Sequence, residues 1–158
     1  MKQTLLIIAA LMLVVGCSSP EPINIDELVE RDGIWHSKDT NKPYSGDVVG
    51  EFGNGQIRVE FTFKNGKPDG LYTSWYENGQ KFEEGTYKNG KRERKWTVWY
   101  ESGKLGGKGT YKDGKWDGLV TEWHENGQKW EEETWKDGKF IERIRWDEYG
   151  NVTNHFIP

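Results

Sequence analysis

Cys17 is the only cysteine of the chain, and a thiol is a strong nucleophile among protein side chains. With no second cysteine, the chain can form no internal disulfide and no site of several thiolates. Cys17 closely follows an apolar run from Leu5 to Val15, and Lys2 precedes that run. The run is far shorter than the roughly 20 residues of a transmembrane helix, but it has the length of the apolar part of a secretory signal. We therefore expect Cys17 to be modified in an exported protein.

Residues 14–17, Val-Val-Gly-Cys, resemble the lipobox of bacterial lipoproteins. This resemblance implies that residues 1–16 are a signal peptide, that the thiol of Cys17 takes a diacylglyceryl group, and that the new amino group is usually acylated, for example with palmitate. Two or more acyl chains hold a protein firmly in a membrane. Ser18 rather than aspartate follows the cysteine, so the expected location is the cell envelope, at the outer membrane in a Gram-negative cell. The alternative is an ordinary apolar leader with a chance cysteine.

No other residues form a recognisable catalytic or metal-binding pattern. The three histidines, His36, His124 and His155, have separations that match no metal-ligand spacing, and no phosphate loop or dinucleotide fingerprint is present. Charged residues make up 30% of the chain with a net charge of −4, and no wide basic stripe favours nucleic acid. We expect no catalysis, no cofactor, no metal, no nucleic acid and no small-molecule substrate. A glycan-acting enzyme, the least favoured alternative, needs two carboxylates facing each other across a pocket.

The one candidate binding surface is a column of aromatic residues that recur at equivalent positions. It comprises Trp75, Trp99 and Trp123, with Tyr76, Tyr100 and His124 beside them. Aromatic faces on an exposed sheet can stack sugars or hold a partner strand. The favoured interpretation is instead that these tryptophans are buried between hairpins, because small repeats have few other residues with which to bury area. A second column is expected to form a ladder of rings: Phe63, Tyr87, Tyr111 and Trp135.

Two series of turn signals recur every 24 residues and position these columns. The Asn65 series is Asn65-Gly66, Asn89-Gly90, Asp113-Gly114 and Asp137-Gly138, each followed by lysine. The Asn54 series is Asn54-Gly55, Asn78-Gly79, Ser102-Gly103 and Asn126-Gly127, with Tyr149-Gly150 closing it. Such dipeptides indicate hairpins with type I′ turns. Two turns per period predict two strands per repeat, in an antiparallel meander from about Tyr44 to Trp146.

The segment between the first two turns supports this all-β fold class. Apolar residues alternate with polar ones from Ile57 to Lys64, which is the pattern of a strand with one buried face. Gly85 and Gly109 are expected to leave room for a neighbouring ring over the backbone. The expected organisation is a signal peptide over 1–16, the lipidated cysteine with a flexible tether and lead-in over 17–42, and the repeat domain over 43–158. One short helical turn is possible within residues 25–30.

The repeats resemble the bacterial variant of the MORN repeat. The runs from Gly70 to Gln80, from Gly85 to Lys91 and from Gly118 to Gln128 carry the resemblance, and residues 42–46, Lys-Pro-Tyr-Ser-Gly, are typical of its lead-in. It implies an elongated sheet of hairpins, usually without enzymatic activity. Arg94 departs from the pattern, because it stands where the other repeats have Gly70 and Gly118.

Three functions are therefore considered. The first is a membrane-anchored, non-catalytic repeat module that binds a protein or an envelope polymer. The second is an antitoxin, because many bacterial members of this family are filed as antitoxins of the YwqK family; however, the leader directs the chain outward, whereas an antitoxin normally meets its toxin in the cytoplasm. The third is the envelope glycan-acting enzyme.

Overall fold

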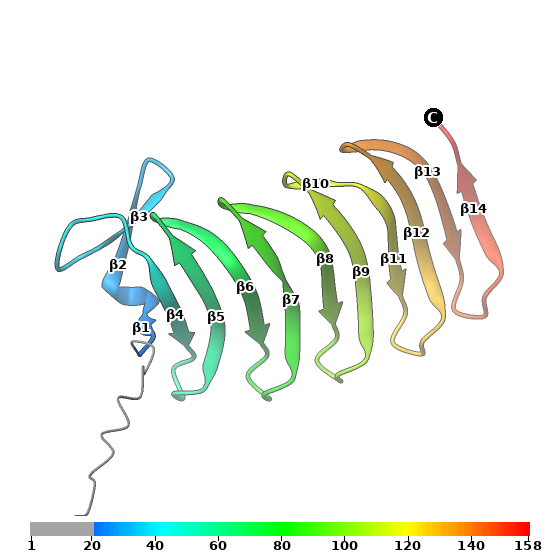
Figure 1. Ribbon diagram of the computed structural model, residues 1–158. Coiled ribbons are helices and arrows are strands. Elements are labelled where there is room, and N and C mark those ends of the chain that lie inside the picture. The colour runs from blue at the N-terminus through cyan, green and yellow to red at the C-terminus, as the bar shows by residue number, and fades with distance from the viewer. Residues whose placement is uncertain (1–20) are drawn as a thin grey trace, which may run out of the picture.

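The computed structural model describes residues 21–158, so the predicted signal peptide and Cys17 lie outside the described residues. The chain forms one long sheet in which hairpins follow one another side by side (Figure 1). All neighbouring strands of this sheet are antiparallel except β1, which runs parallel to β4. The predicted all-β meander is confirmed and extends past Trp146 to Phe156. Within residues 21–158, no helix has the length and apolar character needed to cross a membrane.

The strands are β1 Ile23–Asn24, β2 Leu28–Arg31, β3 Ile34–Ser37, β4 Gly46–Glu51, β5 Ile57–Lys64, β6 Lys67–Trp75, β7 Lys81–Lys88, β8 Lys91–Trp99, β9 Leu105–Lys112, β10 Lys115–Trp116, β11 Gly118–Trp123, β12 Lys129–Lys136, β13 Lys139–Trp146 and β14 Val152–Phe156. A single 3₁₀ turn, η1, spans Ile25–Glu27.

The two turn series have different geometries. At Asn65 and Gly66 φ is +51° and +74°, and the equivalent pairs are similar, so the predicted type I′ turns are confirmed for the Asn65 series. In the Asn54 series only the glycine has positive φ, for example +83° at Gly55. Here the Gly55 amide donates to the Phe52 carbonyl at 2.9 Å, as in a type I turn followed by a glycine bulge. The prediction of type I′ turns was therefore wrong for the Asn54 series.

Each turn of the Asn65 series is fastened to the preceding repeat. The Gly90 amide donates to the Pro68 carbonyl at 2.7 Å, and the Asn89 amide donates to Asp69 Oδ2 at 3.0 Å. Ser45, Glu93 and Asp117 accept from the equivalent amides of Asn65, Asp113 and Asp137. Because both turn amides find partners one repeat away, these bonds link every hairpin to its neighbour.

Arg94 has a positive φ, as do the glycines at the equivalent positions, but a different one. Its φ is +61°, whereas Gly70 and Gly118 have φ of +147° and +111°. The pairing of β7 with β8 shifts register between Glu84 and Thr86, opposite this residue. The departure from the repeat pattern therefore changes the conformation at this site but keeps the hairpin.

The two faces of the sheet differ in what they bury. Phe61, Tyr72, Trp96 and Tyr111 project from β5, β6, β8 and β9 to one face, which we call the aromatic face. Trp96 is 2% exposed, and near the N-terminal end Leu28, Val48 and Phe63 form a buried cluster. The opposite face, which we call the outer face, carries the alternate residues of the same strands.

The glycines of β7 and β9 make room for these rings, as the sequence predicted. A β-carbon at Gly85 would lie 2.2 Å from the Trp96 ring, and one at Gly109 would lie 2.5 Å from the Trp116 ring. Both distances are shorter than van der Waals contact, so neither position tolerates a side chain without movement of the ring. The indoles thus lie directly on the backbone of the neighbouring strand.

The predicted ladder of Phe63, Tyr87, Tyr111 and Trp135 is not formed by these residues stacking on one another. Equivalent residues lie two strands apart, about 10 Å, which exceeds the 4.5–7 Å of an aromatic pair. Rings from the intervening strands fill the gaps instead. Trp96 lies 5.0 Å from Tyr87 and 6.2 Å from Tyr111, and Trp116 stacks on Tyr111 at 3.7 Å between ring centroids.

The lead-in predicted over 17–42 is folded from Ile23 onward. β1 pairs with β4, and the β2–β3 hairpin packs beside it at the N-terminal end of the sheet (Figure 1). The predicted helical turn is confined to η1, which Asn24 caps. Leu28 begins β2 instead of continuing the helix, because its side chain is 4% exposed in the cluster with Val48.

Candidate binding surface

A groove of about 340 Å³ crosses the aromatic face between β6 and β11. Its floor is β9, where Gly106, Gly107 and Gly109 have no side chains to fill it. Its walls are aromatic and are formed by Tyr76, Phe82, Trp96, Tyr100 and Trp116. We call this the aromatic groove. A second depression of about 660 Å³ shares Tyr76 and Phe82 with it and continues toward Phe61 on β5.

Phe82 is the most accessible ring of this surface. Its side chain is 41% exposed, and it meets Tyr76 edge-on at 5.1 Å between centroids. Its position in the repeat corresponds to Gly106 and Trp130, 24 and 48 residues further on. One repeat therefore offers a ring where the next leaves the backbone bare, which opens the groove between them.

Two charged groups of the aromatic groove form an ion pair with each other. Glu83 is 8% exposed and pairs with Arg92, whose Nη2 lies 2.8 Å from Oε1. The guanidinium of Arg92 also lies 4.0 Å from the Trp96 ring centroid. Burial raises the pKa of the Glu83 carboxyl, while Arg92 acts in the opposite direction. This ion pair therefore braces β7 and β8 beneath the groove.

The second carboxylate that borders the groove is also occupied. Glu122 Oε2 accepts a hydrogen bond of 2.8 Å from Trp130 Nε1. Because Glu83 and Glu122 both already have protein partners, the surface is better suited to binding through ring faces than to proton transfer.

Tyr76 and Tyr100, both predicted as site residues, line the groove and also join repeats. The Tyr76 hydroxyl donates to the Trp99 carbonyl at 2.9 Å, and the Tyr100 hydroxyl donates to the Trp123 carbonyl at 2.5 Å. His124 occupies the equivalent place in the next repeat, and its Nε2 is buried without a hydrogen-bond partner. The hydrogen bond that joins successive repeats at Tyr76 and Tyr100 is therefore absent at His124.

Strand alternation places the side chains of the predicted tryptophan column on the outer face, opposite Trp96, although Trp99 also borders the aromatic groove and Trp75 borders the second depression. Along β8, alternation turns Trp99 away from Trp96 and Val98, and Lys81 Nζ lies 5.9 Å from the Trp99 ring centroid. Lys108 stands over Trp123 in the same way, at 5.1 Å. Trp75, Trp99 and Trp123 are all only partly buried. The expectation that these three form the buried core was wrong, because Trp96 fills that role on the other face.

Sequence reasoning missed the ring and the ion pair at the centre of the groove. Trp96 has no tryptophan at the equivalent positions of other repeats, which are Tyr72 and Val120, so it belongs to no column. The Glu83–Arg92 pair likewise does not recur. The available signal was the run Gly106-Gly107 with Gly109, which is unusual for the interior of a strand and indicates a close approach of other groups.

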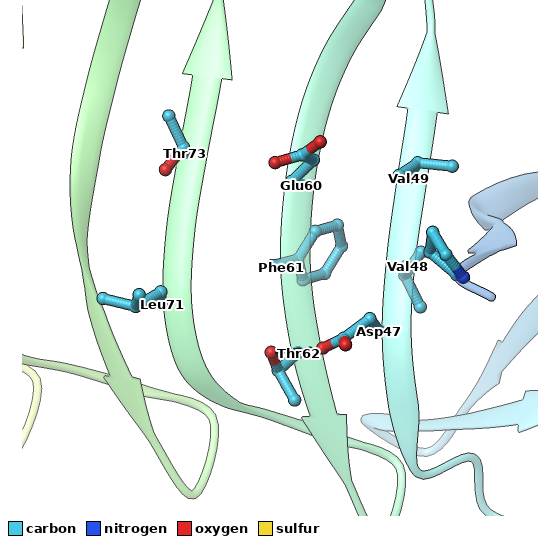
Figure 2. Close-up of a pocket in the computed structure, with 9 residues that line it drawn as sticks. Asp47, Val48, Val49, Glu60, Phe61, Thr62, Leu71 and Thr73 are labelled. Carbon is cyan, nitrogen blue, oxygen red and sulfur yellow. Dashed lines mark hydrogen bonds between the residues drawn. The ribbon is translucent and has the colours of Figure 1, made fainter. Parts of the chain in front are cut away.

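A third depression, of about 330 Å³, lies on the outer face near the N-terminal end (Figure 2). Asp47, Glu60, Thr62 and Thr73 line it from β4, β5 and β6, and Thr62 Oγ1 donates to Asp47 Oδ1 at 2.7 Å. Leu71 stands at its rim and is 72% exposed. Val49 and Phe61 also line it, but Phe61 is its one ring, so this depression offers fewer ring faces to a ligand than the aromatic groove does. In residues 21–158, no three His, Cys, Asp or Glu side chains gather to hold a metal ion.

Part of the repeat array is similar to a known family. The model of the MORN repeat variant family matches residues 68–89, 95–113 and 116–137. These segments contain most of β6 to β9 and of β10 to β12, which build the aromatic groove. No curated protein matches the chain significantly. These three segments are therefore similar to the MORN repeat of the variant type.

Proposed function

We propose that the protein is a non-catalytic binding module, tethered to the cell envelope by lipid on Cys17, whose aromatic groove binds a polysaccharide of the envelope. The observation that carries the proposal is the groove itself, in which rings stand over a strand of glycines. Ring faces stack well on the apolar faces of sugars, and a bare backbone lets a ligand approach closely. The match to MORN repeats supports a repeat module that presents a long surface.

The periodicity of the array favours an extended ligand over a compact one. Equivalent positions of successive repeats lie two strands apart, about 10 Å. The aromatic groove and the depression beside it share Tyr76 and Phe82, so rings are offered along the array beyond a single repeat. A linear glycan, whose sugar rings recur at regular intervals, can contact several such rings at once.

The test is a titration of the chain from residue 21 onward with soluble linear fragments of the cell-wall glycan, followed by tryptophan fluorescence and calorimetry. We expect saturable binding, and we expect Phe82→Ala to weaken it about tenfold, the equivalent of losing roughly 1.4 kcal/mol of ring contact. Leu71→Ala is the matched control, because it removes an even more exposed apolar side chain from the outer face. Equal affinity in the Phe82→Ala and Leu71→Ala proteins, or no binding of glycan at all, would contradict the proposal.

A further inference from the structure

The two ends of the sheet differ in how much of the chain packs against the last strand. At the N-terminal end, β1 pairs with β4, and the Trp35 amide of β3 donates to the Gly66 carbonyl at 2.8 Å. At the C-terminal end, β14 pairs with β13 alone, and no described segment pairs with its other side (Figure 1). One end is therefore capped and the other presents free backbone amides and carbonyls.

The uncovered end also carries the exposed apolar residues of the last hairpin. Tyr149 is 79% exposed, Val152 61%, Phe156 46% and Ile157 64%. β14 contains no lysine, arginine, aspartate or glutamate, whereas every other strand of five or more residues contains at least one. Edge strands are commonly protected from pairing by charged side chains, and β14 lacks this protection.

The strand is nevertheless held in place for pairing. The Phe156 ring stacks on Phe140 of β13 at 6.0 Å, and the Arg143 guanidinium lies 5.8 Å from the Phe156 ring. His155 Nε2 lies 2.7 Å from Glu142 Oε1, so its side chain is turned to its own chain. A strand ordered in this way loses little conformational freedom when it pairs further.

We propose that β14 pairs antiparallel with β14 of a second copy, which joins the two sheets into one across a twofold axis. A twofold axis places each residue of β14 near the same residues of the second copy, so a charged residue close to the axis would face a like charge. β14 contains no lysine, arginine, aspartate or glutamate, so this repulsion does not arise. The exposed apolar residues of β14, Val152 and Phe156, would bury area against the β14 strand of the second copy. Because the twofold contact uses the β14 edge of both copies, it closes at two copies instead of growing into a filament.

The pairing makes a definite prediction at the centre of the strand. Full overlap of the five residues of β14 brings Asn154 opposite Asn154 of the partner subunit. Asn154 is exposed and pairs with Arg145 on β13, so lysine or glutamate can replace it without disturbing a buried contact. In a dimer of two lysine variants or of two glutamate variants, like charges face each other. In a dimer of one lysine and one glutamate variant, opposite charges face each other.

The experiment is analytical ultracentrifugation of the processed protein across a range of concentrations, with circular dichroism to verify folding. We expect a monomer–dimer equilibrium in the unaltered protein, and an increase of at least about tenfold in the dissociation constant of both Asn154→Lys and Asn154→Glu. An equimolar mixture of the two variants should restore dimers. Leu71→Lys, far from the edge, should leave the equilibrium unchanged. A protein that is monomeric at all concentrations, dimers unaffected by Asn154→Lys, or a mixture that stays monomeric would overturn the proposal.

Discussion

Arg94 carries backbone strain that its equivalents in other repeats avoid. Its φ of +61° is in the left-handed region, which costs an ordinary residue about 1–2 kcal/mol. Gly70 and Gly118 have no β-carbon to clash there. The side chain of Arg94 is exposed. The free-energy cost of the positive φ therefore arises at Arg94 alone, and a substitution of Arg94 measures it.

We predict that Arg94→Gly stabilises the protein by about 0.5–1 kcal/mol, because relief of the strain exceeds the extra entropy that glycine gains in the unfolded chain. Urea denaturation measures the difference. Lys95→Gly is the control, since it removes a neighbouring exposed side chain where φ is not positive, and it should destabilise by a similar amount. Destabilisation by both changes would show that Arg94 is not strained.

The carboxylates that accept turn amides make stability depend on pH. The hydrogen bond from the Asn89 amide lowers the pKa of Asp69, and the hydrogen bond from Lys136 lowers that of Asp117. A lowered carboxyl pKa stabilises the fold above the unfolded value of about 3.9 and loses that effect as pH falls through the folded value. Burial raises the pKa of Glu83, so its contribution has the opposite sign and softens the acid loss.

We predict that the double variant Asp69→Asn/Asp117→Asn has a shallower loss of thermal stability between about pH 4 and pH 2 than the unaltered protein. Asparagine keeps an oxygen for the turn amide but does not titrate. The measurement is the melting temperature against pH. Asp39→Asn, at an exposed site between β3 and β4, is the control and should leave the slope unchanged. The same slope in all three proteins would count against the role of Asp69 and Asp117.

At the scale of the elements, one indole connects several strands. The Trp96 ring of β8 contacts Tyr72 of β6, Tyr87 of β7 and Tyr111 of β9 at centroid distances of 5.5, 5.0 and 6.2 Å. Its Nε1 donates to the Thr86 carbonyl at 3.2 Å. In a repeat array, where each unit contacts only its neighbours, such a ring couples the N-terminal hairpins to the C-terminal ones.

We predict that Trp96→Ala costs about 3–5 kcal/mol, the usual range for truncating a buried aromatic, and makes unfolding broad or biphasic. Trp99→Ala should cost less than half of this, because the outer-face ring is partly exposed and is covered by Lys81. Chemical denaturation, followed at two wavelengths, measures the free energy of unfolding of both variants and shows whether unfolding occurs in one step. Should Trp99→Ala prove as costly as Trp96→Ala, the outer face would be an equal part of the core.

At the scale of the whole molecule, the sheet is an elongated row of hairpins with one capped end, and the proposed lipid anchor precedes that end in the sequence. Residues 14–17 are the reason to expect lipid on Cys17. We predict that Cys17→Ser leaves the precursor uncleaved and unlipidated, because the hydroxyl of serine does not replace the thiol nucleophile. Labelled fatty acid, followed in cells, measures this. Incorporation of label into Cys17→Ser protein would remove the anchor from the proposal.

The sequence by itself determined the hairpin repeat and its period. Asn-Gly and Asp-Gly pairs at a spacing of 24 residues act locally, because their glycines, and in the Asn65 series both residues, adopt positive φ at little cost. Gly85 and Gly109 likewise signalled a close approach of rings, which the structure confirms. These features follow from short-range sterics, so they can be recognised in one strand at a time.

Only the tertiary structure decided which tryptophan is buried and where a groove opens. Alternation assigns Trp96 and Trp99 to opposite faces of the sheet, but it does not say on which face the side chains of the neighbouring strands bury a ring. That depends on rings from non-equivalent positions, such as Tyr72 and Trp116, meeting across pairs of strands. The cap formed from Ile23 onward has the same origin, because Leu28 is buried only through contact with residues far along the chain.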